Sequence, residues 1–251
     1  MKPVIRAAAV IPARYGSTRF PGKPLALIQG RPMILWTLAQ VRRALQIQRI
    51  VVATDCDRIE EIVRGDGGEV IMTASDLASG TDRVAVAATS IDTDLVANVQ
   101  GDEPLIDPAH IDLAVLALID DPLASVATLA APIRSEADLM DENIVKVLVD
   151  ERQHAVYFSR IPIPYPGRLS HRKSGDIQGY FRHIGLYVYR KAFLMRFAEH
   201  PPVFSERIER LEQLRTLEMG EKIAVRFVET NAPSIDTPDD LTKLYTLLRR
   251  R

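Results

Sequence analysis

Short apolar runs alternate with segments of helical period through the first half of the chain, and this pattern is the strongest constraint on its fold. The strand-like runs are Ala7–Ile11, Arg49–Ala53, Glu69–Met72 and Leu95–Gln100. The helical segments are one opened by Pro32 with Ile34, Leu35, Leu38, Val41 and Leu45 on one face, then Arg58–Arg64 capped by Asp57, Thr81–Ser90, and Ala109–Ile119 after Pro108. Near-continuous apolar strands separated by helices predict an α/β fold whose mostly parallel sheet is covered on both faces.

The second half changes character. Its strand-like segments are Ser125–Pro132, Val145–Val149, His154–Ser159, His183–Arg190 and Ile223–Val228, and its helical segments begin at Lys191, span Ser205–Met219 and follow Pro238. Alternation with aromatic and β-branched residues favours antiparallel pairing here. Residues 161–179 are rich in Pro, Gly and Ser, which is typical of a loop. We expect a single domain over residues 1–251, with a smaller antiparallel insertion at about 125–190.

The composition excludes several classes of protein. The 251 residues are 47% hydrophobic, enough for one large core. Lys and Arg (32) nearly balance Asp and Glu (33), so no overall field attracts nucleic acid or a membrane surface. The single cysteine, Cys56, excludes an internal disulfide and any CxxC metal site. No targeting pattern precedes the first strand and no apolar run reaches membrane-spanning length, so we expect a cytoplasmic protein.

A basic, glycine-containing loop follows the first strand. The segment Ala13–Pro24 reads ARYGSTRFPGKP; it carries Arg14, Arg19 and Lys23, with Gly16, Gly22, Ser17 and Thr18 between them. Glycines let the backbone approach a ligand, while the cations and hydroxyls bind phosphate oxygens. Ligands of α/β sheets bind at this carboxyl edge. The segment therefore predicts a triphosphate site, against the alternative of a solvated basic loop, and it is neither a P-loop nor a GxGxxG fingerprint.

Two aspartates are candidate ligands for a metal ion. Asp102 closes the fourth strand in NVQGDEP, and Asp236 lies in IDTPDD before the last helix. In the second motif Thr237 and Asp240 suit a helix cap, which leaves Asp236 without a local structural role. Hard carboxylate oxygens beside a triphosphate suit Mg²⁺. The alternative for Asp102 is ordinary turn chemistry in GDEP.

Seven strings place the chain beside a known family. In order, they are PARYGSTRFPGKPL, SGTDR, NVQGDEPLI, YFSRIPIP, RHIGLYVYR, LEQLR and IDTPDD. This set resembles the 3-deoxy-manno-octulosonate (Kdo) cytidylyltransferases, or CMP-Kdo synthetases, from about residue 9 to the last helix. The basic loop, NVQGDEP and LEQLR together separate it from the sialate enzymes. The resemblance implies a three-layer, Rossmann-like nucleotide-diphospho-sugar transferase fold.

The resemblance also implies a reaction and a site. The anomeric hydroxyl of Kdo, an acidic eight-carbon sugar, attacks the α-phosphate of CTP with Mg²⁺ as cofactor, in an enzyme expected to be a homodimer. By resemblance, Arg14, Arg19 and Lys23 match phosphate-binding positions, and Asp102 and Asp236 match the metal ligands; Lys23, Arg14, Asp102 and Asp236 form the expected catalytic set. The expected nucleotide-binding residues are Ala13, Arg14, Gly16, Ser17, Arg19, Lys23, Ser79, Gly80, Thr81 and Gln100, and the expected sugar-acid-binding residues are Gln100, Arg160, His183, Tyr187, Glu212 and Gln213.

Two departures from the family pattern keep alternatives open. Leu77-Ala78 stands before SGTDR where the family commonly has His-Gln, and residues 161–178 carry Tyr165-Pro166 and a basic stretch where a Trp is common. The acceptor is therefore Kdo, its 8-amino analogue or a sialate-type sugar. A sugar-1-phosphate transferase and a non-catalytic nucleotide-binding protein are the remaining hypotheses. On the residues alone, Arg160, His183 and the Glu212–Gln213 pair are equally compatible with surface or packing roles.

Overall fold

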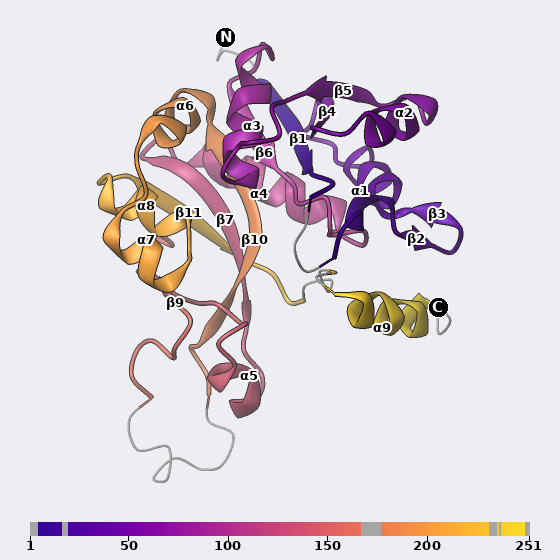
Figure 1. Ribbon diagram of the computed structural model, residues 1–251. Helices are drawn as coiled ribbons and strands as arrows, with labels where there is room; N and C mark the ends of the chain where they lie inside the picture. The colour runs from indigo at the N-terminus through magenta and orange to yellow at the C-terminus, as the bar shows by residue number, and fades with distance from the viewer. Residues whose placement is uncertain (1–4, 17–19, 167–176, 231–234, 236, 249–251) are drawn as a thin grey trace. The chain divides into compact units, whose positions relative to one another are not determined.

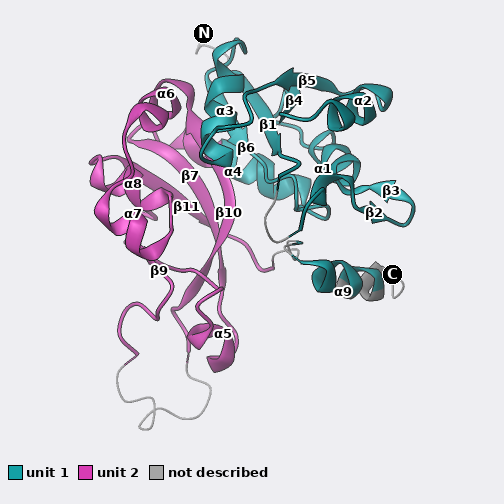
Figure 2. Cartoon of the chain, viewed as in Figure 1, with its two compact units in different colours: residues 1–115, 232–251 teal, residues 116–231 magenta. Residues whose placement is uncertain are grey.

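The computed structural model describes residues 5–16, 20–166, 177–230, 235 and 237–248, without the side chains of 243 and 246–248. The chain forms two compact units (Figure 2): unit 1 comprises residues 1–115 and 232–251, and unit 2 comprises residues 116–231. The fold is α/β with a mostly parallel central sheet, as the sequence predicts. The expected single domain with an insertion at about 125–190 stays a prediction, and each unit is described by itself.

Four parallel strands form the sheet of unit 1 (Figure 1). They are β1 (Ala7–Ala13), β4 (Arg49–Thr54), β5 (Glu69–Met72) and β6 (Leu95–Asn98). β1 pairs with β4 on one side and β6 on the other, and β5 pairs with β4, which gives the order β6-β1-β4-β5. β1 is buried along nearly its whole length, in agreement with its apolar sequence. A short hairpin, β2 (Leu27–Ile28) and β3 (Arg31–Pro32), follows the 3₁₀ turn η1 (Lys23–Leu25).

The helices of unit 1 connect these strands. They are α1 (Met33–Val41), α2 (Asp57–Gly65), α3 (Gly80–Thr89), the start of α4 (Pro108–Asp120) and α9 (Pro238–Leu248). α1 and α2 carry the chain from β1 towards β5, and α3 carries it back past β1 to β6. Right-handed crossovers therefore place α3 on the face opposite α1 and α2. No described helix is long and apolar enough to span a membrane.

Two details of the predicted helices in unit 1 are wrong. α1 ends at Val41, so Leu45 is not part of its apolar face; Leu45 is 84% exposed, and its backbone N–H donates to Asp112 instead. Asp57 is the first residue of α2 rather than its cap, and the capping position belongs to Cys56, without a side-chain hydrogen bond. By contrast, Thr237 and Asp240 form the predicted cap of α9, with the Thr237 N–H donating to Asp240 Oδ2 at 3.0 Å.

Unit 2 holds the antiparallel part of the structure. Its strands are β7 (Ala124–Pro132), β8 (Lys146–Val149), β9 (Ala155–Ser159), β10 (Phe181–Arg190) and β11 (Lys222–Phe227). β10 pairs antiparallel with β7 and β8, β8 pairs antiparallel with β9, and β11 pairs parallel with β7. The helices are α5 (Glu136–Met140), α6 (Lys191–Glu199), α7 (Phe204–Glu209) and α8 (Gln213–Glu218). Antiparallel pairing over 125–190 is thus confirmed.

The helix expected over Ser205–Met219 is two helices. α7 ends at Glu209, and the next residue, Arg210, has a φ of 55°, in the left-handed region that a continuous helix cannot contain. A buried ion pair between Arg215 of α8 and Glu206 of α7 joins the two helices across the break. Ile208 of α7 is 69% exposed, so this apolar side chain is not part of the core.

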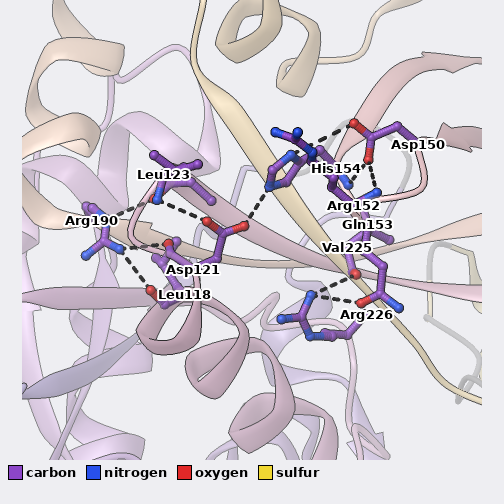
Figure 3. Close-up of polar contacts among 11 residues, drawn as sticks. Leu118, Asp121, Leu123, Asp150, Arg152, Gln153, His154, Arg190, Val225 and Arg226 are labelled. Atoms are coloured by element: carbon purple, nitrogen blue, oxygen red, sulfur yellow. Dashed lines mark hydrogen bonds and ion pairs between the residues drawn. The ribbon is translucent and has the colours of Figure 1, made fainter.

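A cluster of charged residues joins the β8–β9 turn, the segment after α4 and the end of β10 (Figure 3). His154 Nε2 lies 2.6 Å from Asp121 Oδ2, which connects the β8–β9 turn to the end of α4. Asp150 Oδ1 accepts the N–H of His154 at 2.8 Å, and Arg190 donates to the carbonyls of Leu118 and Asp121 at 2.9 and 3.0 Å. The charged atoms of this cluster are therefore directed into the unit's own backbone and into one another.

Candidate functional site

The strand order of unit 1 places a ligand site between β1 and β6. The chain leaves β1 towards β4 and β5 and returns to β6 on the other side, so the loops after β1 and β6 diverge at their shared carboxyl edge. Such a switch point is where open α/β sheets bind ligands. The first loop is the basic segment that begins at Arg14, and the second is Gln100–Pro104. The topology therefore brings together the two motifs that the sequence singled out.

An ion pair joins the two loops. Lys23 Nζ lies 2.5 Å from Asp102 Oδ2, with the side chains 13% and 26% exposed. Gly101 allows the strand ends to approach closely, because a Cβ at this position would lie 2.9 Å from the carbonyl oxygen of Pro12. In the basic loop after β1, Arg14 and Gly16 are exposed. Lys23 and Asp102, predicted to serve phosphate and metal, are thus in direct contact.

The segment before α9 is anchored to the same place. The N–H of Ile235 donates to the backbone carbonyl of Asp102 at 3.0 Å, and Ile235 is fully buried in a small apolar cluster with Ile28, Met33 and Leu244. Asp236 follows Ile235 in sequence but lies outside the described residues, as do Ser17 and Arg19. Their predicted roles stay predictions.

A chain of side-chain amides and hydroxyls links β6 to the start of α3. Gln100 Nε2 donates to Asn98 Oδ1 at 3.0 Å, and Asn98 Nδ2 donates to Thr81 Oγ1 at 3.4 Å. Ser79 caps α3 through a reciprocal pair of hydrogen bonds with Asp82. A Cβ on Gly80 would lie 3.7 Å from Pro12 Cγ, close to the end of β1. Four predicted nucleotide-side residues, Ser79, Gly80, Thr81 and Gln100, therefore gather at one place.

Glu103 is a buried carboxyl group beside Asp102. Only 7% of the residue is exposed. Burial, and then the negative charge of Asp102, raises the pKa of Glu103 to about 8. The group is therefore mostly protonated at neutral pH, which limits the negative charge at this edge of the sheet. Glu103 lies within NVQGDEP, but no pattern in the sequence predicts a role for it.

In unit 2, His183 and Tyr187 of β10 lie together, with ring centroids 5.3 Å apart. Burial lowers the pKa of His183 to about 3, so its ring is neutral at physiological pH. Its Nε2 is 3.0 Å from Thr128 Oγ1, whose own proton has backbone carbonyls of β10 as acceptors. Nε2 is then the protonated nitrogen and Nδ1 the acceptor. Burial, followed by the charges of Tyr189 and Glu212, raises the pKa of Tyr187.

The remaining predicted acceptor-side residues have mixed surroundings. Arg160 donates from Nε to the Glu209 carbonyl at 2.7 Å and from Nη1 to the Glu142 carbonyl at 3.0 Å, so part of its guanidinium holds the backbone. Glu212 occupies the position before α8 without a side-chain capping hydrogen bond, and Gln213 is the first residue of that helix. Gln213 is 5% exposed, and its buried Nε2 has no hydrogen-bond partner within the described part of the chain. Gln213 thus retains donor capacity, while Arg160 has a structural function as well.

Three comparisons with known proteins agree on one family. The model of a family described as cytidylyltransferase matches residues 8–223. The chain is 52% identical over 246 residues to a 3-deoxy-manno-octulosonate cytidylyltransferase of Syntrophotalea carbinolica, covering 96% of this chain and 98% of that protein. It is 45% identical over 244 residues to the protein of the same name from Bdellovibrio bacteriovorus, covering 97% and 98%. The chain belongs to the 3-deoxy-manno-octulosonate cytidylyltransferase family.

Solved structures of cytidylyltransferases share the fold of this chain. A CMP:2-keto-3-deoxy-manno-octonic acid synthetase complexed with CTP superposes with a TM-score of 0.91 at 40% identity, covering 98% of this chain and 99% of that one. A cytidylyltransferase of Leptospira borgpetersenii has a TM-score of 0.66 at 18% identity over 99% and 88% of the two chains, which shows the shared fold alone. The resemblance read from the seven sequence strings is therefore confirmed at the level of family and fold.

Proposed function

We propose that this chain transfers CMP from CTP to the anomeric hydroxyl of Kdo, the activation step that lipopolysaccharide synthesis requires. The hydroxyl oxygen attacks the α-phosphorus, the bond from that phosphorus to the oxygen bridging to the β-phosphate breaks, and pyrophosphate leaves with the electron pair. The products are CMP-Kdo and pyrophosphate. The observation that carries the proposal is the Lys23–Asp102 contact at the switch point, in a chain whose relatives share the cytidylyltransferase name.

The nucleotide lies at the carboxyl edge of unit 1 in this proposal. Lys23 and Arg14, with Ser17, Arg19 and the backbone of Ala13 and Gly16, bind the phosphate oxygens. Ser79, Gly80, Thr81 and Gln100 lie on the side of the base. A transfer of this kind needs in-line positioning and neutralisation of charge rather than a protein nucleophile. Cations on the leaving side stabilise the charge that develops on pyrophosphate.

Mg²⁺ fits the donors at this edge. Asp102 offers a hard carboxylate that is partly exposed and already in contact with the Lys23 ammonium, so it accepts a cationic neighbour. The described residues hold no cluster of three His, Cys, Asp or Glu able to bind a metal alone. Mg²⁺ needs none, because it is commonly held by one or two carboxylates with phosphates and water. We propose Asp102 and Asp236 as its ligands; when bound, Mg²⁺ supplies charge neutralisation and lowers the pKa of a contacting hydroxyl.

The sugar acid is assigned to residues of unit 2. His183 offers neutral imidazole Nδ1 as an acceptor for a sugar hydroxyl, since burial holds its pKa at about 3. Tyr187 remains protonated and can donate, because burial raises its pKa. The unpartnered Nε2 of Gln213 is a second donor. Arg160 and Glu212 complete the proposed set for the carboxylate and hydroxyls of Kdo.

A substrate panel tests the proposal. The protein is incubated with CTP, Mg²⁺ and, in separate reactions, Kdo, its 8-amino analogue, a sialate and a sugar 1-phosphate, and pyrophosphate release is followed. We expect the highest kcat/KM with Kdo. Preference for the 8-amino analogue or a sialate would move the acceptor assignment, and CTP binding without turnover on any acid would make the chain a nucleotide-binding protein. Replacing Mg²⁺ with EDTA is expected to abolish turnover.

The location and assembly are part of the same proposal. We propose a cytoplasmic homodimer that takes no nucleic acid or membrane as partner; the single cysteine and the near balance of charges support this setting. Sedimentation equilibrium at micromolar concentration gives the mass of the assembly, and a monomer mass would contradict the dimer.

A further inference from the structure

A buried ion pair lies beneath the phosphate loop of unit 1. Arg83 Nη2 is 3.0 Å from Asp55 Oδ2, and the two side chains are 3% and 12% exposed. Arg83 belongs to α3, one turn after Ser79–Thr81, and Asp55 directly follows β4. The second nitrogen of the fork, Nη1, donates to Thr73 Oγ1 in the segment after β5. One guanidinium therefore ties the ends of two strands to the start of α3.

Asp55 also holds the phosphate loop. Its Oδ1 accepts the N–H of Tyr15 at 3.4 Å, so its two oxygens face two different segments. Three residues further along, the Arg58 guanidinium lies over the Tyr15 ring at 5.7 Å from its centroid. On the other side the N–H of Gly22 donates to the Tyr15 carbonyl at 3.0 Å, and a Cβ on Gly22 would lie 3.3 Å from the ring. Tyr15 is thus fixed through its N–H, its carbonyl and its ring.

This arrangement connects two parts of the nucleotide site that lie far apart in sequence. Tyr15 stands between Arg14 and Gly16 in the basic loop, while Arg83 stands two residues after Thr81 on the side of the base. A carboxylate near a triphosphate would repel it, and the Arg83 charge offsets this. If a cationic side chain of the loop paired with Asp55, its charge would no longer be available to bind phosphate. The loop contacts Asp55 through the backbone N–H of Tyr15 instead.

We propose that Asp55 and Arg83 are positioning residues that set the triphosphate loop relative to the base-side loop, a proposal that rests on the proposed function. Neither residue touches substrate; both act through Tyr15 and the start of α3. Small misplacements of reacting groups cost about 10²-fold in rate. Loss of the pair is therefore expected to weaken CTP use far more than sugar-acid use.

The decisive variant is D55L/R83M. Replacing both members of a buried ion pair with apolar side chains of similar volume commonly preserves stability, whereas removing one member alone leaves a buried charge. The double variant thus keeps the packing but removes the acceptor for the Tyr15 N–H. We expect near-normal thermal stability, a Kd for CTP raised at least about tenfold, equivalent to roughly 1.4 kcal/mol, and a KM for Kdo within about twofold of wild type.

Asp66 supplies the matched control within unit 1. Its two oxygens also bridge two arginines, Arg31 at 3.1 Å and Arg42 at 2.7 Å, in a segment outside the nucleotide loops. D66N is expected to lower stability without changing the Kd for CTP. Where D55L/R83M does not fold, D55A is measured in its place, with the same expected loss of CTP affinity, because Ala also lacks an acceptor for the Tyr15 N–H.

Calorimetric titration with CTP gives a readout that needs no acceptor sugar. A stable D55L/R83M or D55A that binds CTP within about twofold of wild type would overturn the positioning role and leave the pair purely structural. Equal losses of CTP affinity in D66N and the Asp55 variants would overturn it as well. A wild type that binds CTP but releases no pyrophosphate with Kdo would instead reject the acceptor assignment, so the two failures are distinct.

Discussion

Two regions of the chain bury charge, and they differ in where that charge is directed. At the carboxyl edge of unit 1, Lys23 and Asp102 meet while part of each side chain stays exposed. In the Asp121–His154 cluster of unit 2 (Figure 3), the carboxylates accept backbone N–H groups and the imidazole, and Arg190 donates to backbone carbonyls. Burial of charge alone therefore does not mark a functional site. A site keeps bonding capacity for a ligand, whereas a structural cluster consumes its capacity internally.

The largest expected effect is on Asp102. D102A removes the proposed metal ligand and leaves Lys23 without this carboxylate, so we expect kcat to fall by roughly 10²–10³-fold or more while the protein stays folded. Pyrophosphate release measures the rate and circular dichroism the fold. D112N is the control, because Asp112 accepts two backbone N–H groups in unit 1 at 3.0 and 2.7 Å. Near-normal turnover in D102A would place the metal elsewhere.

The second prediction concerns the closed cluster of unit 2. D121N weakens the contact at 2.6 Å with His154 and the bond from the Leu123 N–H at 3.0 Å. We expect the free energy of unfolding to fall by about 1–3 kcal/mol, the cost of leaving buried polar groups unpaired. Urea denaturation measures this loss, and kcat/KM per folded molecule is expected to stay at the wild-type value. A loss of turnover in folded D121N would remove the contrast between the two regions.

The third prediction concerns the pH dependence of stability that follows from the burial of His183, a proposed sugar-binding residue. His183 is neutral in the folded protein down to its pKa of about 3, while in the unfolded chain it takes up a proton below about pH 6.5. The unfolded state thus binds more protons between these values, and stability falls with falling pH. This residue contributes at most about 1.4 kcal/mol per pH unit.

Substitution isolates this contribution of His183. H183Q is expected to flatten the acid limb of the unfolding free energy between about pH 6.5 and 4, relative to wild type. Burial also lowers the pKa of His110, but His110 is present in both proteins and cancels in the difference. Parallel acid limbs for H183Q and wild type would mean that the ring of His183 is as easily protonated in the folded chain as in the unfolded one.

A helix or strand of this fold could be predicted from the sequence where neighbouring residues determine it, and not where residues distant in the sequence do. The buried strands β1, β4 and β6 and the helix α4 were predicted because apolar runs and helical period record burial directly. The break between α7 and α8 was missed, because no Gly or Asn marks the left-handed position, which Arg210 occupies, and the Arg215–Glu206 pair across the break is visible only in the structure. Leu45 was misplaced for a related reason, since Asp112, 67 residues away, holds its backbone.

The candidate site divides in the same way. The basic loop and Asp102 stood out because charge and glycine at a strand end are visible in a single stretch of sequence. The Asp55–Arg83 pair joins residues 28 positions apart, and the SGTDR string that contains Arg83 gives no local sign of its partner. Arg160 was expected to bind the sugar acid, with a surface role as the alternative, and only the structure places the carbonyls of Glu142 and Glu209 on its guanidinium.

The smallest expected effect is at an exposed ion pair of unit 2. Arg134 Nη2 lies 2.8 Å from Glu229 Oε2, a distance close to that of the Asp121–His154 pair, but the two side chains are 66% and 86% exposed. Water already solvates both charges, so E229Q is expected to change the free energy of unfolding by less than about 0.5 kcal/mol. A double-mutant cycle of R134Q and E229Q, read by urea denaturation, measures the coupling. If that coupling equalled the loss in D121N, burial would not be what gives the closed cluster its strength, and the distinction would have to rest on the backbone bonds alone.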